Sequence, residues 1–319
     1  MRSKDDLCLI CNLYKSDKTN SHFIPAGLLK SNIGERNYEE AYMIGVSEQA
    51  PITDYFGRSN LKNTDPEIKQ NPHAADYIFC SKCEDKLAEL ENEFVPYLNS
   101  LKKKFAGKQD NVLVFGDLNT LRFKVFVYSL IYRLNLQSVL KNLLTGIDFH
   151  LFNKLRLIIS NKFAGLDYLV DTSINFSVFA SLNNEYDYSM NFVGINTFFI
   201  NPLLMVNEFH IVPYIPPFPL INSSFESAFK HYQNLDGLTN KQVSIYNVET
   251  EKWLTVHEHL VNYQAYQFRT IRIGQLMRKT KQTFEECQQK LYNLAEKIHL
   301  ETSKPFGISY DVAFKKLIE

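Results

Sequence analysis

The chain has 319 residues, of which 45% are hydrophobic and 22% charged, and its 35 basic and 35 acidic side chains give a net charge of zero. These values are ordinary for soluble globular proteins. They exclude a mostly disordered chain and a protein that coats nucleic acid by bulk positive charge. The length suffices for two domains, each with its own core.

The N-terminal stretch MRSKDDLCLI lacks the apolar segment of a secretory signal, and the most apolar run, VFVYSLIYRL, contains Arg133. We therefore expect no signal peptide and no membrane-spanning helix. Without a secretory signal, closely spaced cysteines are more often metal ligands than disulfides. This pattern favours a cytoplasmic protein with no membrane partner.

Two Cys-x-x-Cys pairs lie in the first third of the chain, Cys8 with Cys11 and Cys80 with Cys83. Four thiolates at this spacing can surround one tetrahedral ion and leave no open coordination position. The spacing predicts a structural zinc ion held by all four cysteines. The residues between the pairs show little periodicity, as in a small module that needs a metal to fold. Four free cysteines remain the alternative.

A helix is expected directly after the second pair, because apolar residues recur at intervals of three and four. They are Leu87, Leu90, Phe94, Leu98, Leu101 and Phe105. The order of a cysteine knuckle, an insert and a helix that carries the last two ligands predicts a treble-clef module. The basic and polar stretch KKKFAGKQDN at 102–111 then marks a domain boundary, which we place between residues 1–106 and 107–319.

The predicted second domain is larger and mixed, which makes the chain α+β. A buried helix is expected to begin at Asn119 or Thr120, and a shorter helix should follow at 148–160. Residues 166–215 are rich in β-branched and aromatic side chains and predict an antiparallel sheet. C-terminal helices should follow, one of them opened by a capping box.

The stretch SHFIP at 21–25, set between a Cys-x-x-Cys pair and the stretch FCSKCE at 79–84, resembles a known family. It is similar to the zinc-stapled branch of the HNH (ββα-metal) endonucleases, and in particular to a bacterial group with Ser-His-Ile-Ile-Pro and Cys-x-x-Cys-Glu motifs. The resemblance covers about the first 95 residues. It implies an HNH-like, metal-dependent endonuclease, such as those of bacterial anti-phage systems and mobile elements.

The resemblance also implies site residues. His22 takes the place of the general base, and Glu84 takes the place of a cation ligand on the helix. Ser21 stands where related chains have a metal-binding residue. The catalytic cation would be Mg or Mn, bound through Glu84, with Asp76 as a second candidate. The alternative is that both residues are structural: His22 packs within the module, and the helix dipole alone favours Glu84 at its position.

Two basic clusters are candidates for contact with DNA or RNA. They comprise Lys102, Lys103, Lys104, Arg269, Arg272, Arg278 and Lys279. Ordinary solvated helix faces are the alternative. His257 and His259 do not predict a second metal site, because they lack a third ligand.

Two functions of different classes therefore stay open. The first is an HNH-like nuclease. The second is a non-catalytic zinc-finger protein that binds nucleic acid or a partner protein encoded nearby.

Overall fold

The computed structural model describes most helices and parts of the sheets. The described ranges are 2–28, 41–44, 52–56, 73–105, 112–116, 118–140, 149–170, 175–180, 193–196, 203–206, 209–214, 238–239, 242–247, 266, 269–302 and 306–318. His257 and His259 lie outside them.

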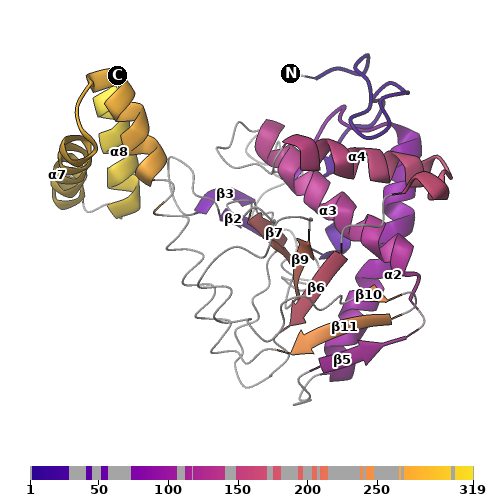
Figure 1. Cartoon of the computed structure of the whole chain (residues 1–319). Coiled ribbons are helices and arrows are strands. Elements are labelled where there is room, and N and C mark those ends of the chain that lie inside the picture. Colours follow the sequence, from indigo (N-terminus) through magenta and orange to yellow (C-terminus); the bar gives the residue numbers. More distant parts are fainter. Residues whose placement is uncertain are drawn as a thin grey trace. The chain divides into compact units, whose positions relative to one another are not determined.

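Two short strands, β1 (Ser21–His22) and β4 (Ala74–Ala75), pair in the N-terminal region, and the long helix α2 (Ser81–Phe105) follows β4 (α2 is labelled in Figure 1). The antiparallel pairing of β1 with β4 brings together residues more than fifty positions apart. Helix α2 begins within the second cysteine pair and continues through Pro96. It confirms the helix predicted after Cys83.

Helix α3 (Thr120–Leu140) is buried on most of its circumference, as predicted. It begins after Asn119, whose side-chain oxygen accepts a hydrogen bond from the backbone N–H of Arg122 at 3.1 Å. Asn119 is therefore the N-cap. Helix α4 (Phe149–Phe163) follows and packs against α3, and a short 3-10 helix, η2 (Asp167–Leu169), ends this segment.

A seven-stranded sheet follows the order β10-β11-β6-β9-β8-β7, with β5 on β11. Its strands are β5 (Val112–Phe115), β6 (Asn175–Ala180), β7 (Val193–Asn196), β8 (Leu203–Val206), β9 (Phe209–Tyr214), β10 (Leu238–Thr239) and β11 (Gln242–Asn247). The β6-β9-β8-β7 run is antiparallel, as predicted for 166–215. The β11–β6 pair is parallel, so the sheet is mixed rather than purely antiparallel.

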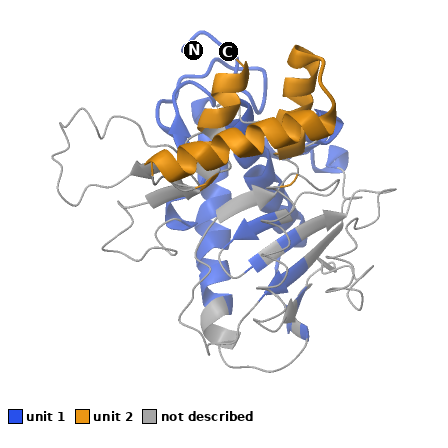
Figure 2. Cartoon of the chain, turned by 90° about the vertical axis from the view of Figure 1, so that its left-hand side faces the viewer, with its two compact units in different colours: residues 1–41, 57–256 blue, residues 42–56, 257–319 orange. Residues whose placement is uncertain are grey.

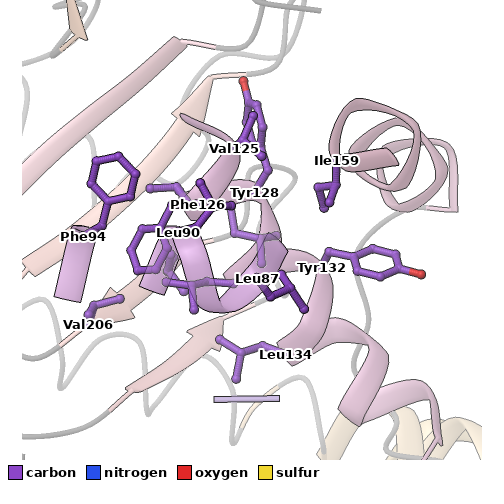
Figure 3. Packing of buried hydrophobic residues seen from close by; sticks show 14 of the residues in the cluster. Leu87, Leu90, Phe94, Val125, Phe126, Tyr128, Tyr132, Leu134, Ile159 and Val206 are labelled. Carbon is purple, nitrogen blue, oxygen red and sulfur yellow. The ribbon is translucent and has the colours of Figure 1, made fainter. Parts of the chain in front are cut away.

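One buried hydrophobic cluster joins the cysteine region to the helices and the sheet. Figure 3 shows part of it, in which Leu87, Leu90 and Phe94 of α2 lie near side chains of α3, and Ile159 of α4 and Val206 of β8 belong to the same cluster. Residues of both predicted domains thus share one core.

The chain divides into two compact units, shown in Figure 2. Unit 1 comprises residues 1–41 and 57–256, and unit 2 comprises 42–56 and 257–319. The predicted boundary between residues 106 and 107 falls within the range of unit 1, so it does not coincide with this division.

Unit 2 contains the predicted C-terminal helices. Residues 269–280 form one helix, and α7 (Phe284–Thr302) and α8 (Phe306–Ile318) pack on each other. Thr283 and Glu286 exchange hydrogen bonds at the start of α7, so the predicted capping box is present. Strands β2 (Ala41–Ile44) and β3 (Ile52–Phe56) form a separate two-stranded sheet. None of the helices within the described ranges has the length and apolar character needed to cross a membrane.

Candidate metal centre

The four predicted cysteine ligands converge. The sulfur atoms of Cys8, Cys11, Cys80 and Cys83 all lie within 4.8 Å of one another. A tetrahedral zinc ion with Zn–S bonds of about 2.3 Å requires sulfurs about 3.8 Å apart. The Sγ atoms of Cys11 and Cys80 are 3.8 Å apart, so the cluster has the size of a zinc site.

Local backbone geometry explains why these cysteines meet. The backbone N–H of Asn12 donates to the carbonyl of Cys8 at 2.9 Å, and Asn12 adopts φ 54°, a left-handed conformation that asparagine tolerates. The turn allows the thiols of Cys8 and Cys11 to lie together in the four-cysteine cluster. At the second pair, the backbone N–H groups of Cys83 and Glu84 both donate to the carbonyl of Cys80 at 3.0 Å.

The thiols differ in acidity before any metal binds. A hydrogen bond from Cys83 lowers the pKa of the Cys8 thiol to about 5, whereas burial raises the pKa of Cys80 to about 11. The same hydrogen bond raises the pKa of Cys83. A bound cation would deprotonate all four, since thiolates are the ligands of zinc.

The histidine of the SHFIP stretch lies on the short β-pair beside the cysteines. His22 is opposite Ala74, and the backbone N–H of Phe23 donates to the carbonyl of His73 at 2.7 Å, which extends the pairing. His22 is half-buried, and burial lowers its pKa, with opposing contributions from Glu91, which raises it, and Arg133, which lowers it. The imidazole therefore favours its neutral form, which a general base requires.

Ser21 and Glu84, from β1 and the first turn of α2, lie next to each other. The Oγ atom of Ser21 and the Oε1 atom of Glu84 are shielded from solvent and lack a hydrogen-bond partner within the described part of the chain. Burial raises the pKa of Glu84, while the Ser21 hydroxyl and Arg133 lower it. The Ser21 hydroxyl is therefore close enough to affect the pKa of Glu84, but the two side chains do not have the geometry of a hydrogen bond. Unpartnered buried oxygens require an explanation, and a bound cation that accepts electron pairs from both oxygens is one.

Asp76, the second candidate ligand, forms a local hydrogen bond. Its Oδ1 atom accepts a hydrogen bond from the backbone N–H of Asn20 at 2.7 Å, and its side chain is exposed. This contact fixes the turn that precedes Ser21.

Two residues that the sequence did not indicate as part of a site form an ion pair that contacts His22. Arg133 of α3 donates from Nη1 to Glu91 Oε1 at 2.6 Å and to the carbonyl oxygen of His22 at 3.3 Å. The side chain of Arg133 is 1% exposed and that of Glu91 24%. The available signal was an arginine within the apolar run VFVYSLIYRL, since a buried charge requires a partner.

The predicted nucleic-acid contacts are spread over two parts of the chain. Lys102, Lys103 and Lys104 lie at the end of α2, and their side chains are outside the described part of the structure. Arg278 and Lys279 are exposed on the helix at 269–280.

The remaining two arginines contact aromatic rings within unit 2. Arg269 is exposed and lies 5.9 Å from the ring centre of Tyr310. Arg272 is 2% exposed, and its guanidinium lies 4.7 Å from the ring centre of Phe314. Arg272 therefore packs into unit 2 with its guanidinium over the Phe314 ring, whereas Arg269, Arg278 and Lys279 are exposed.

Comparison with known proteins adds no assignment. The chain matches no family model, no curated protein and no solved structure. The function must therefore be inferred from the residues themselves.

Proposed function

We propose that this chain is an HNH-like, metal-dependent endonuclease built on a treble-clef zinc module. In this proposal Cys8, Cys11, Cys80 and Cys83 bind one structural zinc ion. His22 activates the attacking water, and Glu84 helps to hold a catalytic Mg or Mn ion against the scissile phosphate.

The observation that carries the proposal is the arrangement of β1, β4 and α2 around the cysteines. A half-buried histidine lies on the first strand, and a glutamate lies in the first helical turn after the last ligand. Between these elements, Ser21 Oγ and Glu84 Oε1 have no partner within the described residues. In this proposal the order is that of a ββα-metal site, and the two oxygens serve as contacts for a cation.

The Glu84 carboxylate is the cation contact in this proposal. The positive charge of Arg133 is matched by Glu91 at 2.6 Å, and Lys18 also acts electrostatically on Glu84. Mg is commonly bound through one or two carboxylates together with phosphate oxygens of the substrate. A single glutamate therefore suffices if the nucleic acid supplies the other ligands.

The second candidate is a non-catalytic zinc-finger protein that binds nucleic acid or a partner protein. Its support is the same zinc module, together with exposed basic residues such as Arg278 and Lys279. In this case Ser21 and Glu84 would be packing residues of the module.

Cleavage separates the two candidates. The purified chain should cut DNA or RNA when Mg or Mn is present and should stop cutting when the cation is removed by EDTA. Binding without cleavage under all these conditions would leave the zinc-finger function.

A further inference from the structure

Arg133 is a charged side chain in the middle of α3, a helix that is buried on most of its circumference. It is 1% exposed, yet its Nε atom contacts only the carbonyl of Ser129, at 3.3 Å, within its own helix. Its remaining hydrogen bonds go to residues 42 and 111 positions away in the sequence, Glu91 and His22. Burying such a charge is costly unless it is paired and hydrogen-bonded, so its placement requires an explanation.

The contacts of Arg133 join three elements at one point. The Nη1 atom donates both to the Glu91 carboxylate on α2, at 2.6 Å, and to the His22 carbonyl on β1, at 3.3 Å. Glu91 lies seven residues, or two helical turns, after Glu84, so both face the same side of α2. Arg133 thus connects the strand that carries His22 to the helix that carries Glu84.

Fold stability alone is a weak explanation for this pair. Replacing a buried ion pair by apolar residues of similar size is often neutral or stabilising, because desolvation of both charges offsets their attraction. A directional contact to one particular carbonyl, in contrast, cannot be replaced by an apolar side chain. The contact fixes where β1 lies.

We propose that Arg133, held by Glu91, is a positioning residue that fixes the β1 strand and thereby the imidazole of His22 relative to Glu84. The catalytic part of this inference rests on the proposed nuclease function. A general base must be held close to the proton that it removes and in the correct orientation. Small displacements of the base lower the reaction rate by large factors. Arg133 touches neither water nor phosphate in this role and acts only through His22.

The test uses the full chain and the double variant Arg133→Met with Glu91→Met. Both charges are removed together, so neither is left buried and unpaired. The matched control is Arg122→Met with Glu93→Met, because this ion pair also joins α3 to α2, at 2.8 Å, but has no contact with His22 among its hydrogen bonds. Zinc content and thermal unfolding show whether each variant is folded.

Amide hydrogen exchange of residues 21–23 is the first measurement. The Arg133/Glu91 variant should keep its zinc and exchange these amides about tenfold or more faster than wild type, because the strand has lost its anchor. The Arg122/Glu93 control should exchange them as wild type does. Equal exchange in wild type and in a folded, zinc-loaded Arg133/Glu91 variant would overturn the proposal.

Cleavage kinetics is the second measurement. The variant should lose about 10- to 100-fold in kcat with little change in KM, as is typical when a supporting partner of a site is removed. Wild-type kcat in the folded variant overturns the proposal. If wild type itself cuts nothing, the nuclease function fails, and the exchange measurement still decides whether Arg133 positions β1.

Arg133→Lys covers the case in which the double variant does not fold. Lysine keeps the charge but lacks the planar fork that contacts Ser129 and Glu91 together. Faster exchange at 21–23 with normal zinc content supports the proposal. Exchange and kcat equal to wild type in Arg133→Lys contradict it.

Discussion

The hydroxyl group of Tyr132 donates a hydrogen bond to the backbone carbonyl of Leu9, between the first two cysteines. The next carbonyl, that of Ile10, accepts a hydrogen bond from Arg156 of α4 at 3.2 Å. Helices α3 and α4 therefore hold the knuckle that presents Cys8 and Cys11. The four-cysteine cluster thus depends on contacts from α3 and α4, although in the sequence the cysteines alone indicate it.

The chain should bind one zinc ion, and removing one ligand should unfold the region around it. Cys80→Ser is expected to lose the metal, because four thiolates complete the tetrahedron and structural zinc contributes about 10–16 kcal/mol in zinc-finger peptides. Elemental analysis and thermal unfolding are the measurements.

Cys287→Ser is the matched control for this substitution. Cys287 is also buried, but it lies in unit 2 and belongs to the core of the C-terminal helices. It should keep one zinc per chain. Wild-type protein purified without stoichiometric zinc would contradict the metal centre.

Glu84 should govern the dependence of cleavage on the catalytic cation. Glu84→Gln keeps the shape of the side chain and removes its charge, so the Mg or Mn concentration needed for half-maximal cleavage should rise about tenfold or more. Zinc content should not change. Titration of cleavage against Mg provides the measurement.

Glu89→Gln serves as the control for Glu84, because Glu89 is an exposed carboxylate of the same helix that pairs with Lys86 at 2.8 Å. It should leave the Mg titration unchanged. The same titration curve for Glu84→Gln and wild type would remove Glu84 from the cation site.

The sequence predicted the parts of this centre that depend on local spacing. The cysteine pairs, the helix after Cys83 and the cap at Asn119 each follow from residues close together in the chain. Local spacing carries the required information in these cases, because a tight turn or a helical face involves only neighbouring residues.

The contacts of Arg133 could not be predicted in the same way. A helix that is buried on nearly all sides does not indicate which side faces which neighbour, so the partner of Arg133 stays undetermined. Arg272 illustrates the same limit. It lies in a basic stretch that suggests a solvent-facing surface, but it occupies a buried position of its helix, next to Ile273 and one turn before Leu276.

His22 should make the protein less stable in acid. Burial lowers its pKa in the folded state below the value of about 6.5 that it has when unfolded. Above that value neither state binds a proton, and the stability contribution is complete. As pH falls below it, the unfolded state binds the proton first, so the free energy of unfolding falls by at most about 1.4 kcal/mol per pH unit until the folded-state pKa is reached.

Urea unfolding of wild type and His22→Gln at a series of pH values isolates this contribution. The other histidines titrate in both proteins, so their effects cancel in the difference. We expect the stability advantage of wild type to shrink between pH of about 6.5 and the lower folded-state value. A difference that does not vary with pH would show that the pKa of His22 is not lowered by burial.

Arg272 and Arg278 should affect different properties, although they lie six residues apart on one helix. Arg272→Met removes the cation from the face of Phe314 and should destabilise unit 2 by roughly 1–3 kcal/mol. Arg278→Met changes an exposed side chain and should leave stability nearly unchanged. If Arg278 contacts phosphate, its removal should weaken nucleic-acid binding and reduce the salt slope by about 1.

Thermal unfolding and binding to a labelled oligonucleotide at several salt concentrations distinguish these effects. A salt slope that is the same in wild type and Arg278→Met would exclude Arg278 from the nucleic-acid surface. Unchanged stability in Arg272→Met would mean that its contact with Phe314 contributes nothing measurable.

The most direct measurement is cleavage of DNA and RNA by wild type and His22→Ala in the presence of Mg or Mn. His150→Ala is the control, since His150 is an exposed histidine of α4. We predict that wild type and His150→Ala cut one of the two nucleic acids, while His22→Ala keeps its zinc and cuts roughly a hundredfold or more slowly, because the general base is missing. Equal cleavage by wild type and His22→Ala, or no cleavage of either nucleic acid by zinc-loaded wild type, would contradict the catalytic assignment.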